Sequence, residues 1–267
     1  MAKQDSGARA AGRPRTAIVT GAAQGIGLAI AQRLRREGVE RFVLVDRNAE
    51  GLAKAAATLD AETQPLVLDL ADVAALKETI AKAARDLGSV DVLVNAAGVT
   101  DRGGIRDADP ETFDKLFAIN ARAPFFMIQT VAAFMPRGAT IVNVASMLAY
   151  GGPPFLTAYA ASKAALVTLT KGAANTLKGD GVRVFAINLG WTVTPAEREV
   201  QTRLHGLSDD WAEELAAAQP FGRLLEPEDP AGLVAFLVSR DAAMMTGAII
   251  DLDQFVAGTV DDNPGNA

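Results

Sequence analysis

The sequence predicts an α/β protein with a doubly wound, seven-stranded and mostly parallel sheet that carries helices on both faces. Three observations predict this fold class. Short β-branched segments alternate with helical segments, most of the strand segments are apolar throughout, and a glycine-rich turn joins the first strand to the first helix. Continuously apolar strands are typical of a sheet covered on both faces, and strand–helix repetition with right-handed crossovers gives a parallel sheet. An α/β barrel is the alternative, and the placement of the glycines argues against it.

Strand and helix segments follow one another without a linker or a repeat. The predicted strands are Thr16–Thr20, Phe42–Asp46, Leu66–Asp69, Val90–Asn95, Thr140–Ala145, Val182–Asn188 and Ala248–Leu252. The predicted helices span residues 25–37, 48–59, 72–87, 110–136, 157–179 and 227–239. We therefore expect one domain over residues 15–257, with flexible tails at 1–14 and 258–267.

Composition excludes several classes of function. The 267 residues include 26 Lys and Arg against 32 Asp and Glu, a formal charge of −6 that argues against nucleic-acid binding. Cysteine is absent and His205 is the one histidine, so we expect neither thiolate catalysis nor a metal site. The chain has no long uninterrupted apolar stretch, and its first fifteen residues lack the apolar centre of a signal peptide. These features predict a cytoplasmic protein without a membrane partner.

The glycine-rich turn, Thr20-Gly21-Ala22-Ala23-Gln24-Gly25-Ile26-Gly27, predicts dinucleotide binding. Gly21 allows a sharp turn, Gly25 allows the backbone to approach a pyrophosphate, and Gly27 allows close packing of the helix on the strand. The free N–H groups at the start of the helix would then face the phosphates. An ordinary glycine-rich turn is the alternative.

Asp46 ends the second strand, 19 residues after Gly27. A carboxylate at this position accepts hydrogen bonds from the ribose hydroxyls of adenosine and repels a 2′-phosphate. Gln24 gives the loop no cation for such a phosphate, so the sequence predicts NAD as the cofactor. Arg47 follows directly; it is either a solvated residue at the start of a helix or a contact for a phosphate.

Further motifs follow in order: Asp69-Leu70, Asn95-Ala96-Ala97-Gly98, Asn120, Ser146 and Tyr159-Ala160-Ala161-Ser162-Lys163. Together with the Gly-x-x-x-Gly-x-Gly spacing, they resemble the short-chain dehydrogenase/reductase family in its single-domain form. The resemblance covers residues 15–252. It implies a Rossmann-type fold and an NAD-dependent oxidoreductase that acts on a secondary alcohol and its ketone.

The resemblance also implies which residues form the site. The implied cofactor contacts are Gly21, Gln24, Gly25, Ile26, Gly27, Asp46, Arg47, Asp69, Leu70, Asn95, Ala96, Ala97, Gly98, Tyr159, Lys163, Gly190, Thr192 and Thr194. The implied substrate contacts are Ser146, Met147, Tyr159 and Trp191. Asp69 would lie beside the adenine, unless it caps the helix that follows. Thr192 and Thr194 would meet the nicotinamide carboxamide.

Tyr159 and Lys163 stand four residues apart on a predicted helix and so share one face. A free tyrosine has a pKa of about 10, and a nearby ammonium favours the phenolate. We therefore expect Lys163, together with the positive charge of an oxidised nicotinamide, to lower the pKa of Tyr159 and to tune it for acid–base catalysis near neutral pH. The resemblance implies that Tyr159 moves the hydroxyl proton, that Ser146 orients the oxygen, and that Lys163 also binds the ribose. It further implies that Asn120 bends its helix and holds a water that relays protons.

Two segments depart from the family pattern. Leu189-Gly190 stands where Pro-Gly is common, and Asp251-Leu252-Asp253 stands where Asp-Gly-Gly is common, which leaves the geometry of the C-terminal segment open. The loop Trp191–Gly222, which would cover the substrate, carries eight charged residues. That loop and the flat face of Trp191 favour a small polar substrate such as a polyol, a sugar or a sugar acid.

Two other functions stay open. A 3-oxoacyl thioester reductase of the same family would favour NADPH and a basic surface for an acidic carrier. A non-catalytic dinucleotide sensor could keep the glycine loop, but this chain also keeps the Tyr/Lys pair. The helices at 110–136 and 157–179 are more apolar than one sheet face requires, and the resemblance implies a homotetramer or a dimer.

Overall fold

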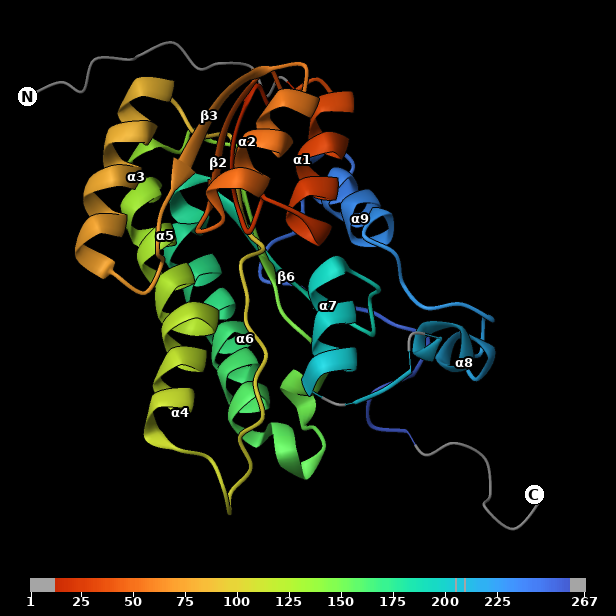
Figure 1. Ribbon diagram of the computed structural model, residues 1–267. Helices are drawn as coiled ribbons and strands as arrows, with labels where there is room; N and C mark the ends of the chain where they lie inside the picture. Colours follow the sequence, from red (N-terminus) through yellow and green to blue (C-terminus); the bar gives the residue numbers. More distant parts are fainter. Residues whose placement is uncertain (1–12, 205, 209, 260–267) are drawn as a thin grey trace, which may run out of the picture.

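Seven strands form one sheet in the order β3-β2-β1-β4-β5-β6-β7, in a computed structural model that describes residues 13–204, 206–208 and 210–259 (Figure 1). The strands are β1 (Thr16–Thr20), β2 (Arg41–Asp46), β3 (Glu62–Val67), β4 (Val92–Asn95), β5 (Thr140–Val144), β6 (Arg183–Leu189) and β7 (Ile249–Leu252). Every neighbouring pair runs parallel. The predicted fold class is confirmed.

Helices cover both faces of the sheet. They are α1 (Gly25–Arg36), α2 (Ala49–Thr58), α3 (Val73–Leu87), α4 (Pro110–Phe117), α5 (Ala123–Val131), α6 (Thr157–Leu177), α7 (Pro195–Glu199), α8 (Trp211–Ala217) and α9 (Glu228–Val238). Buried side chains of α1, α2 and α9 pack on one face, and those of α3, α5 and α6 pack on the other. Because side chains alternate along a strand, Ile18 and Val19 of β1 belong to opposite clusters.

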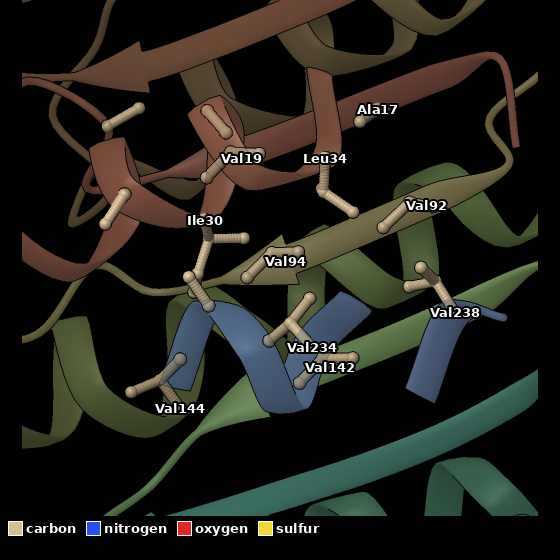
Figure 2. Packing of buried hydrophobic residues seen from close by; sticks show 14 of the residues in the cluster. Ala17, Val19, Ile30, Leu34, Val92, Val94, Val142, Val144, Val234 and Val238 are labelled. Carbon is tan, nitrogen blue, oxygen red and sulfur yellow. The ribbon is translucent and has the colours of Figure 1, made fainter. Parts of the chain in front are cut away.

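The cluster beneath α1 and α9 shows how the helices are held. Ile30 and Leu34 of α1 lie together with Val234 of α9, over Val94 and Val142 of the sheet (Figure 2). All five side chains are fully buried. Burial of each such side chain contributes roughly 1.5–3 kcal/mol, which holds α1 and α9 against β4 and β5.

The third strand is one place where the sequence prediction is wrong. β3 spans Glu62–Val67 rather than Leu66–Asp69. It lies at the edge of the sheet and pairs only with β2, so it needs no continuous apolar run. Pro65 is tolerated because an edge strand has one side free of ladder hydrogen bonds, and Val67 is 60% exposed.

The predicted helix at 110–136 is interrupted. A π-helical turn at Ala118–Arg122 separates α4 from α5, and a 3₁₀ turn at Ala132–Phe134 follows α5. By length and composition alone the run Pro110–Phe134 could cross a membrane, and half of its most apolar window is buried inside the fold.

Several short elements were not predicted, namely α7, α8 and two 3₁₀ turns at Met147–Tyr150 and Pro154–Leu156. The predicted tails at 1–14 and 258–267 lie mostly outside the described residues, as does His205.

The order of the strands locates a crevice. The chain builds the sheet outward in one direction from β1 to β3 and then in the other direction from β4 to β7. Helical connections therefore leave β1 and β4 toward opposite faces, and ligands of such sheets bind at the carboxyl ends of these two strands. The glycine-rich turn after β1 lies at this point.

Candidate active site

The glycine-rich loop packs against the segment that follows β4. Gly21 has a φ of +67°, and a Cβ on it would lie 2.8 Å from the Cα of Ala97, so only glycine fits there. A Cβ on Gly27 would overlap the carbonyl of Gly21, which shows how closely α1 approaches the loop. Gln24 precedes α1 and makes no capping hydrogen bond with its side chain. The first N–H groups of α1 are therefore left for an anion.

Thr20 holds the segment after β4 in place. Its Oγ1 accepts hydrogen bonds from the backbone N–H groups of Ala96 and Ala97, both at 3.1 Å. The side chain of Asn95 instead turns into the core, where Nδ2 donates to Asn143 Oδ1 at 2.8 Å. Thr20 was not among the predicted contacts, although its position directly before the glycine loop is a signal for such a role.

Asp46 is tied to the glycine loop. Its Oδ2 accepts a hydrogen bond from the backbone N–H of Ala23 at 3.1 Å, and its Oδ1 accepts one from Asn48 at 3.0 Å. Each carboxylate oxygen still has a lone pair for a further donor. Arg47 beside it is exposed. The carboxylate is thus fixed where ribose hydroxyls are expected, and the cation next to it faces solvent.

Asp69 does not cap the helix that follows β3. Its Oδ1 accepts a hydrogen bond from Ala71 at 2.9 Å. The cap of α3 is Asp72, whose Oδ1 accepts from Ala75 at 3.0 Å. Leu70 is buried, whereas Asp69 is exposed. The capping alternative for Asp69 is therefore excluded, and its contact with adenine stays a prediction.

Asn120 joins three parts of the site. It lies in the π-helical turn and is fully buried. Its Oδ1 accepts from the N–H of Val99 at 2.9 Å, and its Nδ2 donates to the carbonyl of Val99 at 2.9 Å and to Ser162 Oγ at 3.0 Å. Ser162 Oγ in turn donates to the carbonyl of Tyr159 at 2.7 Å. The π-helical turn interrupts the helix at Asn120, while the bend and the part of Asn120 in a proton relay stay predictions.

The hydroxyl of Tyr159 lies near the hydroxyls of Ser146 and Thr100. Burial raises the pKa of Tyr159, hydrogen bonds with Ser146 and Thr100 oppose this, and the negative charge of Glu197 raises the pKa further. Ser146 is buried, and its Oγ also accepts from the N–H of Leu148 at 3.2 Å. Sequence reasoning missed Thr100 and counted Glu197 only among the charges of the loop 191–222, because neither residue belongs to a motif.

Lys163 lies beneath Tyr159. Its buried Nζ is 5.8 Å from the ring centre of Tyr159 and donates to the carbonyl of Val144 at 3.0 Å. Burial lowers the pKa of Lys163 to about 8. A Cβ on Gly98 would lie 3.2 Å from this Nζ and 3.5 Å from Asn120 Oδ1. The glycine therefore leaves space open between the lysine and the asparagine.

In the protein by itself, the expected lowering of the Tyr159 pKa is not found. Lys163 was expected to lower the pKa of Tyr159, but burial dominates and raises it. The same burial weakens the charge on Lys163. Burial therefore favours the neutral form of each side chain, and a phenolate at Tyr159 needs further positive charge or hydrogen bonding from a bound ligand.

The end of β6 meets the C-terminal segment. Gly190 donates its N–H to the carbonyl of Leu252 at 2.9 Å, and a Cβ on Gly190 would overlap the carboxylate of Asp253. Gln254 then bonds to the end of the loop 191–222 and to the residue after it: its Oε1 accepts from Phe221 N at 2.7 Å and its Nε2 donates to the carbonyl of Arg223 at 2.5 Å. The segment after Leu252, whose geometry the sequence left open, thus folds back onto β6 and the loop.

The residues after Gly190 lie opposite the glycine loop. Thr192 is buried and its Oγ1 donates to the carbonyl of Gly190 at 3.1 Å. Thr194 caps α7, accepting from the N–H of Glu197 at 3.0 Å, and a Cβ on Gly25 would lie 3.4 Å from its side chain. Both threonines therefore lie at the edge where the predicted cofactor would end.

The predicted substrate contacts differ in exposure. Met147 is half-buried, and Trp191 is exposed with its Nε1 on Glu197. Within the residues that the structure describes, no group of three or more histidine, aspartate or glutamate side chains could hold a metal ion.

Comparison with known sequences places the chain among oxidoreductases. The family model described as "Enoyl-(Acyl carrier protein) reductase" matches residues 21–254. A 3-oxoacyl-[acyl-carrier-protein] reductase of Thermotoga maritima is 33% identical over 88% of this chain and 95% of its own length. A sorbitol dehydrogenase of Cereibacter sphaeroides is 34% identical over 90% of this chain and 96% of its own length.

Solved structures agree. NAD⁺-bound xylitol dehydrogenase superposes with a TM-score of 0.82 at 31% identity, covering 90% of this chain and 98% of that one. L-sorbose reductase from Gluconobacter frateurii, in complex with NADPH and L-sorbose, has a TM-score of 0.86 at 27% identity, covering 93% and 98%. With its fold, its motifs and these relatives in agreement over most of its length, the chain belongs to the short-chain dehydrogenase/reductase family of nicotinamide-dependent oxidoreductases acting on alcohol groups.

Proposed function

We propose that the protein is an NAD-dependent oxidoreductase that transfers hydride between a secondary alcohol and nicotinamide, on a small polar substrate such as a polyol, a sugar or a sugar acid. The proposal rests chiefly on one observation. The hydroxyl of Tyr159 is hydrogen-bonded with Ser146, and the buried Lys163 has its Nζ 5.8 Å from the ring centre of Tyr159, at the sheet edge that carries the glycine loop.

The residues present fit a nicotinamide dinucleotide. The cradle at Gly21 has no room for a side chain, and the N–H groups that begin α1 are available to a pyrophosphate. The carboxylate of Asp46 would accept from the adenosine ribose, and Lys163 Nζ would donate to the other ribose. When bound, the cofactor supplies the hydride acceptor of the reaction.

Side chains of the protein would transfer the hydroxyl proton of the substrate. Ser146 Oγ donates to the substrate oxygen and orients it toward Tyr159. During oxidation the phenolate of Tyr159 accepts the hydroxyl proton while the carbinol carbon loses its hydride, and the reverse holds in reduction. Asn120 joins α6 to the segment that follows β4 through its hydrogen bonds with Ser162 and Val99. These bonds hold Tyr159 of α6 in place.

Asp46 supports NAD as the cofactor. Solved relatives include both an NAD⁺ complex and an NADPH complex, so family membership alone does not decide which of the two cofactors this protein uses. A carboxylate fixed by two backbone N–H groups would repel a 2′-phosphate. We expect Asp46→Ser to weaken the preference for NADH over NADPH by raising turnover with NADPH. The additional change Arg47→Ala should remove this increase in NADPH turnover. Faster turnover of NADPH than NADH by the wild type would overturn this assignment.

The substrate class is supported by the loop and by the relatives. The loop 191–222 is rich in charged residues and Trp191 presents a flat, exposed face, and three of the relatives are named for sorbitol, xylitol and L-sorbose. The test is a panel of polyols, sugars, hydroxy acids and cyclic alcohols assayed for NADH formation at alkaline pH, with Tyr159→Phe as the blank. Absence of turnover with every member, in a protein that binds NADH, would refute the proposal.

A 3-oxoacyl thioester reductase is the second candidate, because one similar relative carries that name. The same assay distinguishes the two functions if it includes an acetoacetyl thioester with NADPH. A kcat/KM for the thioester well above every polyol, sugar and hydroxy acid would favour the second candidate. Tight NADH binding without turnover of any compound would favour a dinucleotide sensor.

A further inference from the structure

Two tryptophans form a platform beside the site. Trp191 directly follows Gly190 and is 41% exposed. Its ring stacks on Trp211 of α8 with ring centres 6.0 Å apart and an angle of 28° between the planes. Trp211 is 1% exposed and its Nε1 has no hydrogen-bond partner among the described residues. One face of Trp191 is therefore fixed from behind.

Glu197 is anchored to this platform through one oxygen. Its Oε1 accepts from Trp191 Nε1 at 2.8 Å and from Gln201 Nε2 at 2.7 Å. Gln201 is itself buried. In the described part of the chain, no hydrogen bond reaches Oε2 of Glu197 and no lysine or arginine pairs with it. Glu197 thus has a positioned carboxylate with one oxygen left for a ligand.

This carboxylate lies near the candidate site, close enough for its charge to act on Tyr159. Helix α7 lies at the carboxyl edge of the sheet, between the start of α1 and the segment that leads into α6 (Figure 1). A Cβ on Gly25 would lie 3.4 Å from the side chain of Thr194, which places the beginning of α7 close to the glycine loop. The charge of Glu197 also reaches Tyr159, whose pKa it raises. A substrate oriented on Tyr159 therefore lies within the field of Glu197.

We propose that Glu197 is a specificity-determining residue, whose free Oε2 accepts a hydroxyl of a neutral polyol or sugar lying on Trp191 and whose charge rejects anionic substrates. The proposal rests on the proposed function and narrows it, because it excludes sugar acids. A carboxylate that is not paired with a cation is a strong acceptor of hydrogen bonds from hydroxyl groups. It disfavours a second carboxylate at short range, and specificity often depends on such a repulsive element.

The first test measures charge at this position without any substrate. The protein has two tryptophans, and since Trp211 is buried, collisional quenching of fluorescence reports mainly on Trp191. Glu197→Gln keeps an oxygen for Trp191 Nε1 but removes the charge. We expect the ratio of iodide to acrylamide quenching constants to rise and the caesium to acrylamide ratio to fall. Glu199→Gln, two residues away and paired with Arg203, is the matched control and should change neither ratio.

The second test measures specificity with matched pairs. Sorbitol and gluconate, and galactitol and galactonate, differ in one charged group. We expect the wild type to prefer the neutral member of each pair, and Glu197→Gln to shift the ratio of kcat/KM toward the acid by about tenfold or more. Glu199→Gln should leave the ratio as it is.

The outcomes separate the two proposals. Unchanged quenching ratios in Glu197→Gln overturn the role of Glu197. If Glu197→Gln changes the quenching ratios but leaves the ratio of kcat/KM between acid and neutral substrate unchanged, Glu197 is not a specificity-determining residue. The proposed oxidoreductase function stands in that case. If the wild type oxidises neither member of any pair and no other member of the panel, the proposed function fails, and the quenching ratios still decide whether Glu197 repels anions at Trp191.

Discussion

Tyr159 and Lys163 illustrate how burial sets the chemistry of single residues. In the protein alone, burial raises the pKa of the phenol and lowers that of the ammonium to about 8. Hydrogen bonds with Ser146 and Thr100 oppose the first shift. At neutral pH Tyr159 is therefore a neutral phenol before a ligand enters, while Lys163, with a pKa of about 8, is still mostly protonated. A cationic ligand would then shift Tyr159 toward the phenolate, so proton transfer is linked to cofactor binding.

Tyr159→Phe should cut turnover by roughly 10²-fold or more, the usual scale for the loss of an acid–base group. NADH binding, followed by fluorescence, should stay nearly intact because the ring and Lys163 are retained. Tyr150→Phe is the matched control, since Tyr150 is exposed and donates its hydroxyl to Asp251. Most of the activity surviving in Tyr159→Phe would rule out its assignment as the acid–base residue.

Lys163 should make the stability of the protein depend on pH. Its pKa is about 8 in the folded chain and near 10.5 when unfolded. Between these values the unfolded state binds more protons, so the free energy of unfolding rises with pH. The burial cost of the charged form, up to about 3 kcal/mol, is present below pH 8 and is lost by about pH 10.5.

The measurement compares urea unfolding of the wild type with Lys163→Met, which does not titrate. The free energy of unfolding of the wild type, relative to the variant, should increase from pH 8 to 10.5. A difference that is flat or that falls over this range contradicts a lowered pKa at Lys163.

Residues in motifs were predictable and residues held by tertiary contacts were not. The spacing of Ser146, Tyr159 and Lys163 predicted that they act together, and they lie close in the fold. Thr100 and Glu197 gave no such signal. Their roles depend on how the loop after β4 and helix α7 are placed relative to the carboxyl edge of the sheet. This placement is a tertiary feature that no local sequence pattern encodes.

At the scale of elements, burial explains which predictions succeeded. Strands with two covered faces were found from their apolar runs, and β1, β5 and β6 are buried throughout. β3 was misplaced because an edge strand has little apolar signal. The π-helical turn at Ala118–Arg122 was anticipated only as a bend at Asn120, since one polar residue in a helix does not specify how the backbone adapts.

Asn120→Ala should destabilise the junction of these elements. The substitution leaves the N–H and carbonyl of Val99 without their partner and removes a bond to Ser162, which should cost about 3 kcal/mol. Asn175→Ala on the exposed side of α6 removes only a bond from Lys178 and should cost less than about 0.5 kcal/mol. Urea unfolding of both variants checks this; equal losses would contradict the joining role of Asn120.

At the scale of the whole molecule, two apolar clusters share one sheet. Because the same strands contribute side chains to both clusters, neither cluster could form without the other. We therefore infer a single domain over residues 15–257. The alternation of strands and helices predicted this layering, and the glycine loop located the crevice at β1 and β4. The closure of the C-terminal segment on Gly190 was not predictable, because it depends on Asp253 and Gln254 meeting residues distant in sequence.

Assembly is the last property that the surface predicts. Phe113 of α4 and Phe125 of α5 are 43% and 45% exposed, and Phe113 stacks on Phe117 with ring centres 4.6 Å apart. Exposed aromatic side chains on neighbouring helices are typical of protein interfaces. We therefore expect a homotetramer or a dimer that buries this surface. Light scattering at micromolar concentration should give a mass that is two or four times 27.8 kDa.

The double variant Phe113→Glu/Phe125→Glu should lower that mass, because it places two charges in the core of the interface, where desolvation is costly. Phe221→Glu makes the same change at an exposed aromatic in the loop before α9 and should leave the mass as it is if α4 and α5 form the contact. A wild-type monomer would refute assembly itself. An assembly that survives the double variant but dissociates in Phe221→Glu would instead move the interface to the substrate loop, where it would bear directly on access to Trp191.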